Sequence, residues 1–137
     1  MNEKACVLLA EDEVLIAMEI QDTLEEHDYK VCGIAVTSWD AVKLADRERP
    51  MLALVDVNLA NGSNGLDAVR EMKTRFETPS IIVSGHANED DARSAGAVGW
   101  MAKPFHAVDL LSLMAYALDH VSGRKPQGPR PPGFIAA

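Results

Sequence analysis

The sequence has little that would suggest a membrane or secreted protein. No run of about 18 apolar residues occurs, and the N-terminal stretch MNEKACVLLA is too weakly basic, and its apolar run too short, for a signal peptide. The only two cysteines, Cys6 and Cys32, lack CxxC spacing, so we expect buried, reduced thiols rather than a disulfide. These features predict a cytoplasmic protein without a membrane partner.

Positive charge is also scarce. The net charge is −8 and no Lys/Arg-rich run is present, which argues against nucleic-acid binding. Neither GxGxxG after the first apolar run nor GxxxxGK[ST] occurs, so dinucleotide and nucleoside-triphosphate binding have no support. The histidines lack the spacing of a zinc site.

The chain does contain a regular alternation of short apolar runs and longer amphipathic ones. With 137 residues and 47% hydrophobic residues, it has the size and composition of one domain. Strands are predicted over 4–10, 29–36, 51–57, 80–85 and 97–103, and helices over 13–27, 38–49, 63–76, 88–95 and 105–122. Uniformly apolar strands alternating with helices predict a doubly wound α/β fold, with a five-stranded parallel sheet and helices on both faces.

Two segments depart from this regularity. Residues 88–95 are rich in Asp and Ser, and predict a curtailed or irregular fourth helix. Residues 123–137 carry four prolines and three glycines, so we expect the domain to cover 1–122 and the rest to be a disordered tail, dispensable for folding.

Polar residues stand at the carboxyl ends of several predicted strands. These ends meet at one edge of such a sheet, which would bring together Glu11 and Asp12 after the first strand, Asp56 in the third, Ser84 in the fourth and Lys103 in the fifth. Each pair of carboxylates there would repel by ~4 kcal/mol at an effective dielectric near 20, which a divalent cation relieves. We therefore expect a Mg²⁺ (or Mn²⁺) site. Asp12 and Asp56 would bind it directly, Asn58 through its backbone carbonyl, and Glu11 through water.

A metal beside a carboxylate suits phosphoryl transfer, in which the protein positions groups and neutralises charge. Asp56 would be the nucleophile and phosphorylation site. Lys103 and the Ser84 hydroxyl would hold the oxygens of the resulting acyl phosphate.

The acidic pair followed by LVDVN, IVSG and AKPF resembles the receiver domain of bacterial two-component response regulators, over about residues 4–122. The resemblance implies strand order 2-1-3-4-5 (flavodoxin-like) and phosphorylation of Asp56 by a histidine kinase or histidine phosphotransfer protein. It also implies a switch linking Ser84 to the aromatic Trp100, where the family usually has Tyr or Phe. Trp100 could instead be a fixed cover at the sheet edge.

The same resemblance places Asn58 and His86 beside the path of the water that hydrolyses the phosphoryl group; alternatively, His86 is an ordinary loop residue. The proline that usually follows the phosphorylated Asp is missing, and Gly62 and Gly65 indicate a flexible loop instead.

The first predicted helix has more apolar residues than the core needs. Ile16, Ile20 and Leu24 are spaced to face the sheet. This leaves Val14, Leu15 and Met18 for docking a phosphohistidine partner, unless the helix is wide-faced and packs Val14 and Met18 against loops.

Two other functions remain as alternatives. A haloacid dehalogenase-type phosphatase would need a second Asp two residues after the nucleophile, and that position is Asn58, which cannot relay a proton. A receiver-like interaction module without phosphorylation would not need the whole polar set. We therefore expect a stand-alone, non-enzymatic receiver that signals through an unidentified downstream protein, and leave open a homodimer.

Overall fold

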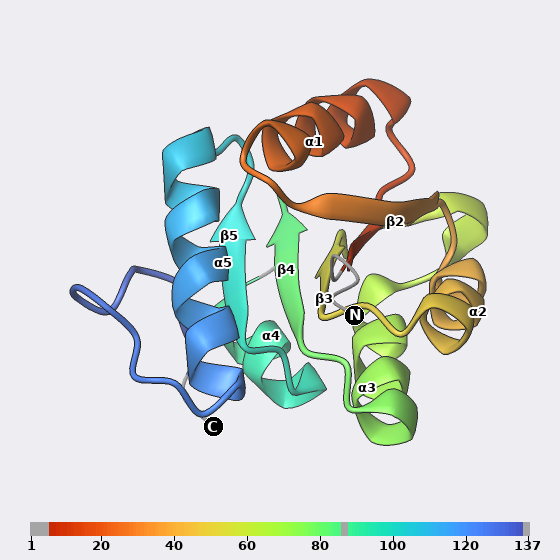
Figure 1. The fold of residues 1–137 in the computed structure, drawn as a ribbon. Helices are drawn as coiled ribbons and strands as arrows, with labels where there is room; N and C mark the ends of the chain where they lie inside the picture. Colours follow the sequence, from red (N-terminus) through yellow and green to blue (C-terminus); the bar gives the residue numbers. More distant parts are fainter. Residues whose placement is uncertain (1–5, 86–87, 136–137) are drawn as a thin grey trace.

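The computed structural model describes residues 6–85 and 88–135. Five parallel strands form one sheet in the order β2-β1-β3-β4-β5, as predicted (Figure 1). The strands are β1 (Cys6–Ala10), β2 (Lys30–Ala35), β3 (Leu52–Val55), β4 (Ser80–Ser84) and β5 (Gly99–Ala102). The helices are α1 (Val14–Glu26), α2 (Ser38–Glu48), α3 (Gly65–Phe76), α4 (Glu89–Ala95) and α5 (Ala107–Val121), with a short 3₁₀ helix at Ala60–Gly62.

The sheet separates two hydrophobic layers, because successive side chains of a strand point to opposite faces. In β1, Leu8 packs with α2, α3 and α4, whereas Val7 and Leu9 pack with α1 and α5. Figure 1 shows α5 beside β5, and α1 at the top of the view, above β2. Burial on both faces explains why the strands are apolar throughout.

Side-chain caps begin three of the helices. Thr37, Asn64 and Asn88 accept hydrogen bonds from backbone N–H groups in the first turns of α2, α3 and α4. The predicted short fourth helix is present with seven residues, and it ends at Gly96, whose φ of 86° suits glycine. None of the helices within the described ranges is long and apolar enough to cross a bilayer.

The tail differs from the prediction of disorder. Residues 124–135 return toward the sheet, where Phe134 and Ile135 are only 7% and 4% exposed. The Trp100 N–H donates to the Gly133 carbonyl at 2.9 Å, and the Ile135 N–H donates to the Val98 carbonyl at 2.8 Å. Composition favoured disorder, but two apolar residues at the end of the segment and an unpaired strand edge outweigh it. The expectation of a disordered tail is therefore wrong for these residues.

Candidate functional site

Two neighbouring strands position the acidic residues. Glu11 and Asp12 directly follow β1, and Asp56 directly follows β3. Backbone hydrogen bonds extend the ladder past the strand ends: the Glu11 N–H donates to the Ala35 carbonyl and the Asp56 N–H to the Ala10 carbonyl, both at 2.9 Å. One carboxylate oxygen from each of the three acids lies within 4.8 Å of the other two. The structure thus brings together the three acids that the sequence suggested for a metal site.

Lys103, just past β5, faces this acidic cluster. Its Nζ donates to Glu11 Oε1 at 2.5 Å and to Asp56 Oδ2 at 2.9 Å. Burial raises the pKa of the Glu11 carboxyl above its usual value, although Lys103 acts in the opposite direction. Burial alone would lower the pKa of Lys103, but the hydrogen bonds to both carboxylates outweigh it and raise the pKa. Lys103 is therefore charged and offsets part of the repulsion among the acids.

The site opens to solvent through a small cavity of about 270 Å³. Its lining residues are Asp12, Glu13, Asp56, Asn58, Gly85 and Lys103. Glu11 lies deeper, 4% exposed, and its Oε2 accepts a hydrogen bond from the Glu13 N–H. The cavity therefore gives a small ligand access to the Asp56 carboxylate.

The donor set fits a hard divalent cation. Mg²⁺ binds oxygen at about 2.0–2.1 Å, so two directly bound oxygens on opposite sides of the ion lie about 4.2 Å apart. Carboxylate oxygens within 4.8 Å can share such an ion, with one of them bound through water. Asp12 and Asp56 line the open cavity, whereas Glu11 is engaged by Lys103, which suits an indirect role for Glu11.

Gly65 has a role at this site that the sequence interpretation missed. A Cβ at Gly65 would lie 1.9 Å from the Asp56 carbonyl oxygen, and the Gly65 N–H donates to the Val57 carbonyl at 2.7 Å. The start of α3 thus packs directly against the backbone that carries Asp56. Close approach, and not flexibility, explains this glycine. Gly62, by contrast, has a φ of 70° and open space around it.

The remaining predicted site residues are placed as follows. Asn58 is exposed at the cavity, and its N–H donates to Asp56 Oδ1 at 3.3 Å. Ser84 is fully buried at the end of β4, and its carbonyl accepts the Lys103 N–H at 3.2 Å. His86 lies outside the described residues.

Trp100 on β5 is half-buried and packs on the face covered by α2, α3 and α4. Its indole also reaches the start of α4: Arg93, and more weakly the Trp100 indole N–H, lower the pKa of the Glu89 carboxyl. Its packing partners thus include the layer that contains Ala92 and Ala95 of α4, and its suggested movement remains a prediction.

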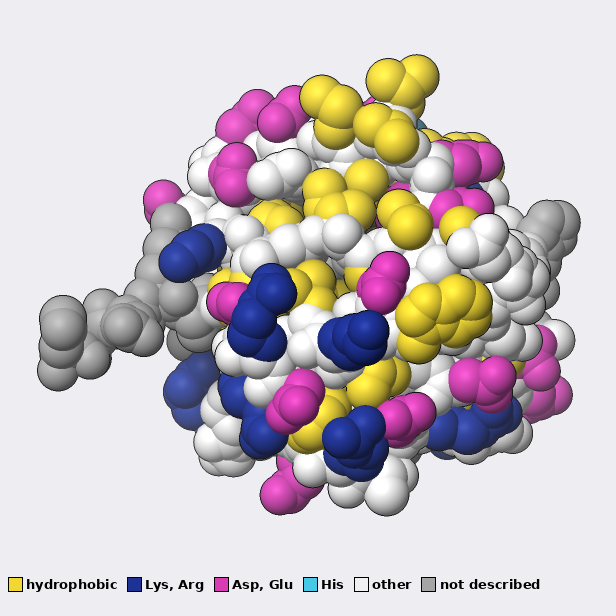
Figure 2. Space-filling model, turned by 90° about the vertical axis from the view of Figure 1, so that its right-hand side faces the viewer, with side chains coloured by type: hydrophobic (Ala, Val, Ile, Leu, Met, Phe, Trp, Pro, Cys, Tyr) yellow, Lys and Arg dark blue, Asp and Glu magenta, His cyan; other side chains and the backbone are white. Residues whose placement is uncertain are grey.

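The apolar residues left over on α1 are exposed. Val14, Leu15 and Met18 are 66%, 81% and 52% exposed, whereas Ile20 and Leu24 are buried in the core. Figure 2 shows hydrophobic side chains gathered at the top of the molecule, where α1 runs. The alternative, in which Val14 and Met18 pack against loops, does not match these exposures.

Comparison with known proteins gives consistent matches. The family described as response regulator receiver domain matches residues 7–115. The chain is 34% identical to the transcriptional regulatory protein PdtaR of Mycobacterium tuberculosis, over 82% of this chain and 56% of PdtaR. It is 36% identical to the phyllosphere-induced regulator PhyR of Methylorubrum extorquens, over 82% of this chain and 43% of PhyR. The chain thus spans about half the length of these relatives or less.

Solved structures agree with this match. A CheY-like receiver domain protein from Methanospirillum hungatei superposes with a TM-score of 0.80 and 26% identity, covering 88% of this chain and 98% of that one. The PhyR receiver domain of Erythrobacter litoralis has a TM-score of 0.76 and 26% identity, covering 98% of this chain and 97% of that one.

Proposed function

The chain belongs to the response regulator receiver domain family of two-component signalling, and we propose that it is switched by phosphorylation of Asp56. The observation that carries this proposal is the position of the Asp56 carboxylate. It lies between two further acids and the Lys103 ammonium, at a cavity open to a small donor. In this arrangement the phosphoryl group would come from phosphohistidine on a histidine kinase or phosphotransfer protein.

The residues around Asp56 would divide the work of phosphoryl transfer. Mg²⁺ held by Asp12, Asp56 and the Asn58 carbonyl would neutralise charge on the transferring group. One Asp56 oxygen attacks phosphorus as the bond to the histidine nitrogen breaks. Lys103 would then exchange its hydrogen bond with Asp56 for one with a phosphoryl oxygen, while remaining paired with Glu11.

We propose that the signal leaves the site through β4 and β5. The Ser84 hydroxyl would donate to a phosphoryl oxygen, and Trp100, two residues before the end of β5, would adjust its position between β5 and α4. Asn58 and His86 would tune the lifetime of the phosphoryl group, with Asn58 supported by its place at the cavity.

The exposed apolar residues Val14, Leu15 and Met18, which we call the α1 patch, would dock the phosphohistidine partner. They project from the helix that begins directly after Asp12 and Glu13, so a partner bound there lies close to the cavity. Relatives of the chain are named as regulators. We infer that output passes to another protein.

The phosphatase alternative is less well supported. The residue two after Asp56 is Asn58, whose side-chain amide does not take up and release a proton near neutral pH and so cannot act as a general acid and base. A receiver-like module that is not phosphorylated would have no need of the clustered acids and Lys103, so this alternative is also less well supported.

Intact-mass analysis after incubation with acetyl phosphate and Mg²⁺ tests the proposal. We expect one phosphoryl group on the wild-type chain and none on Asp56→Asn. Asp109→Asn, on the exposed side of α5, is the matched control and should be labelled as the wild type is. Undiminished labelling of Asp56→Asn would reject Asp56 as the acceptor.

A further inference from the structure

The edge of β5 is paired with the chain's own tail. β5 is the last strand of the sheet, so one of its edges has no neighbouring strand. Residues 133–135 run antiparallel along this edge, with Phe134 opposite Gly99. Two backbone hydrogen bonds join them, from the Trp100 N–H to the Gly133 carbonyl and from the Ile135 N–H to the Val98 carbonyl. The tripeptide thus forms the beginning of a sixth strand.

The two apolar side chains of this segment enter opposite layers of the fold, as in a regular strand. Phe134 packs with the layer of α1 and α5, and its ring meets the rings of Tyr116 and His120 edge-on, with centroids 4.9 and 5.0 Å away. Ile135 joins the layer of α2, α3 and α4. The edge therefore places one side chain against two aromatic rings and the next in the hydrophobic layer on the opposite face of the sheet.

The approach also requires a glycine before these two residues. Gly133 has a φ of 89°, and a Cβ there would lie 2.2 Å from the Trp100 carbonyl oxygen. On the other side, a Cβ on Gly99 would meet the Gly133 carbonyl oxygen at 3.1 Å. A glycine thus lies at the contact on each of the two segments. The β5 edge therefore accepts a segment in which a glycine is followed by two large apolar residues.

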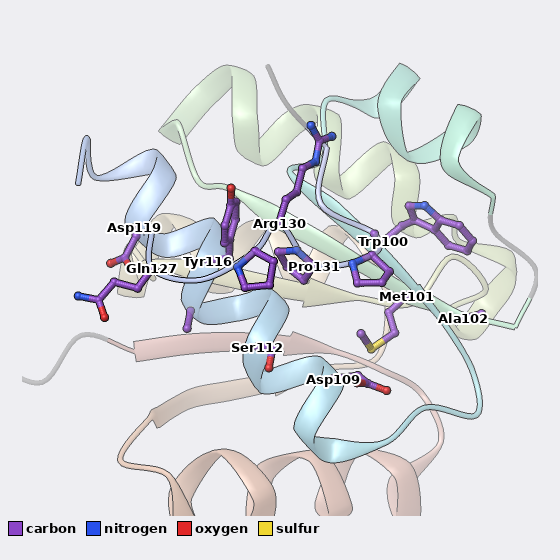
Figure 3. A pocket seen from close by; sticks show the side chains of 14 residues that line it. Trp100, Met101, Ala102, Asp109, Ser112, Tyr116, Asp119, Gln127, Arg130 and Pro131 are labelled. Atoms are coloured by element: carbon purple, nitrogen blue, oxygen red, sulfur yellow. The ribbon is translucent and has the colours of Figure 1, made fainter. Parts of the chain in front are cut away.

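Between its docked end and the end of α5, the tail is tied to the domain at Arg124, which donates from its backbone N–H to the Asp119 carbonyl at 2.9 Å and from its side chain to Asp119 Oδ1 at 3.0 Å. A cavity of about 810 Å³ lies between α5, β5 and residues 127–133 (Figure 3). The connection therefore spans open space and does not pack tightly on α5. Arg130 supports the docked end, because it donates to the Phe134 carbonyl at 3.0 Å and its guanidinium stands 5.2 Å from the Phe134 ring centroid.

We propose that the β5 edge and the Tyr116–His120 pocket form a docking site for an extended Gly-Phe-Ile-type segment. Residues 133–135 occupy this site in cis, and a partner segment of the same chemistry would have to displace them. An edge strand accepts such a segment through main-chain hydrogen bonds, while the pockets select its side chains. The docking site does not involve Asp56, so its test is independent of phosphorylation.

Amide exchange in full-length variants tests the proposal, because the Trp100 N–H is bonded to the tail. In Gly133→Ala the added Cβ should undock the tail, and the Trp100 amide should exchange about tenfold faster or more, because its hydrogen bond to the Gly133 carbonyl is lost. Gly128→Ala is the matched control. Gly128 also has a positive φ, of 79°, but no atom lies within 4 Å of its Cβ position, so protection of Trp100 should not change.

A synthetic peptide with the sequence of residues 129–135, PRPPGFI, then tests docking in trans. Added to Gly133→Ala, it should restore the protection of the Trp100 amide in a saturable way, and the same peptide with Phe134→Ala should not. Unchanged protection in Gly133→Ala, no restoration by the peptide, or equal restoration by both peptides would overturn the proposal.

Should Gly133→Ala fail to fold, exchange in the wild-type chain decides the question. The Trp100 and Ile135 amides should then open locally, faster than the β3 amide of Leu54. Exchange of all three only by global unfolding would mean that the tail is an integral strand, and the proposal would be wrong.

Discussion

The substitution Asp12→Asn should stabilise the metal-free protein while removing its stabilisation by Mg²⁺. Asp12 contributes a carboxylate within 4.8 Å of those of Glu11 and Asp56. At this distance two unit charges repel by ~3.5 kcal/mol at an effective dielectric of 20, and by ~0.9 kcal/mol in water. Because Asp12 faces the open cavity, the value in water is the closer one. We therefore expect Asp12→Asn to raise the free energy of unfolding of the metal-free protein by about 1 kcal/mol. Among the described residues, Asp12 forms no ion pair that the substitution would break.

Urea unfolding in EDTA and in MgCl₂ measures both effects. For the wild-type chain, free Mg²⁺ at about 100 times its Kd should add ~2.7 kcal/mol, and Asp12→Asn should lose most of this gain. Asp22→Asn is the matched control, because it removes the same charge from an exposed position on α1. The repulsion argument would be refuted if Asp12→Asn lowered the stability in EDTA, and the metal assignment would be refuted if Mg²⁺ stabilised Asp12→Asn as much as the wild type.

Three further predictions concern residues that are not themselves metal ligands. Gly65→Ala should destabilise the fold by about 1–3 kcal/mol and slow the labelling of Asp56 by acetyl phosphate, because the added Cβ would overlap the Asp56 carbonyl oxygen. Gly62→Ala is the control: its added Cβ meets no atom, so labelling should stay near the wild-type rate. Phe134→Ala should lower the free energy of unfolding by about 1–2 kcal/mol in urea titrations, less than the ~3–5 kcal/mol of a central core position, because the tail can undock; no change would mean that the tail is not docked in solution. Leu15→Glu should slow phosphoryl transfer from a phosphohistidine protein more than labelling by acetyl phosphate, since only the protein donor needs the α1 patch, and equal slowing would place the defect in the site or the fold.

Local pattern predicted a five-stranded parallel sheet covered on both faces and the polar residues that lie at one edge of it, whereas the strand order was implied by the resemblance to receiver domains. Apolar runs alternating with amphipathic ones specify parallel strands covered on both faces, and a parallel sheet places all carboxyl ends at one edge. The closeness of Glu11, Asp56 and Lys103 follows from this rule, although they are far apart in the chain. The fold prediction is confirmed by the strand order, whereas the chemical roles of these residues remain to be tested.

Only the tertiary structure showed the contacts between segments whose sequences have no repeating hydrophobic pattern. Gly65 looked like a source of flexibility until the start of α3 was seen against the Asp56 carbonyl oxygen, a contact that depends on the path of the whole loop. The tail looked disordered because composition averages over many prolines and glycines. Its docking depends on Phe134 and Ile135, and on a strand edge about 35 residues earlier in the chain that has no other partner. Two residues are too few to show a period, so their burial is determined by the shape and the unpaired backbone groups of the surface that they meet.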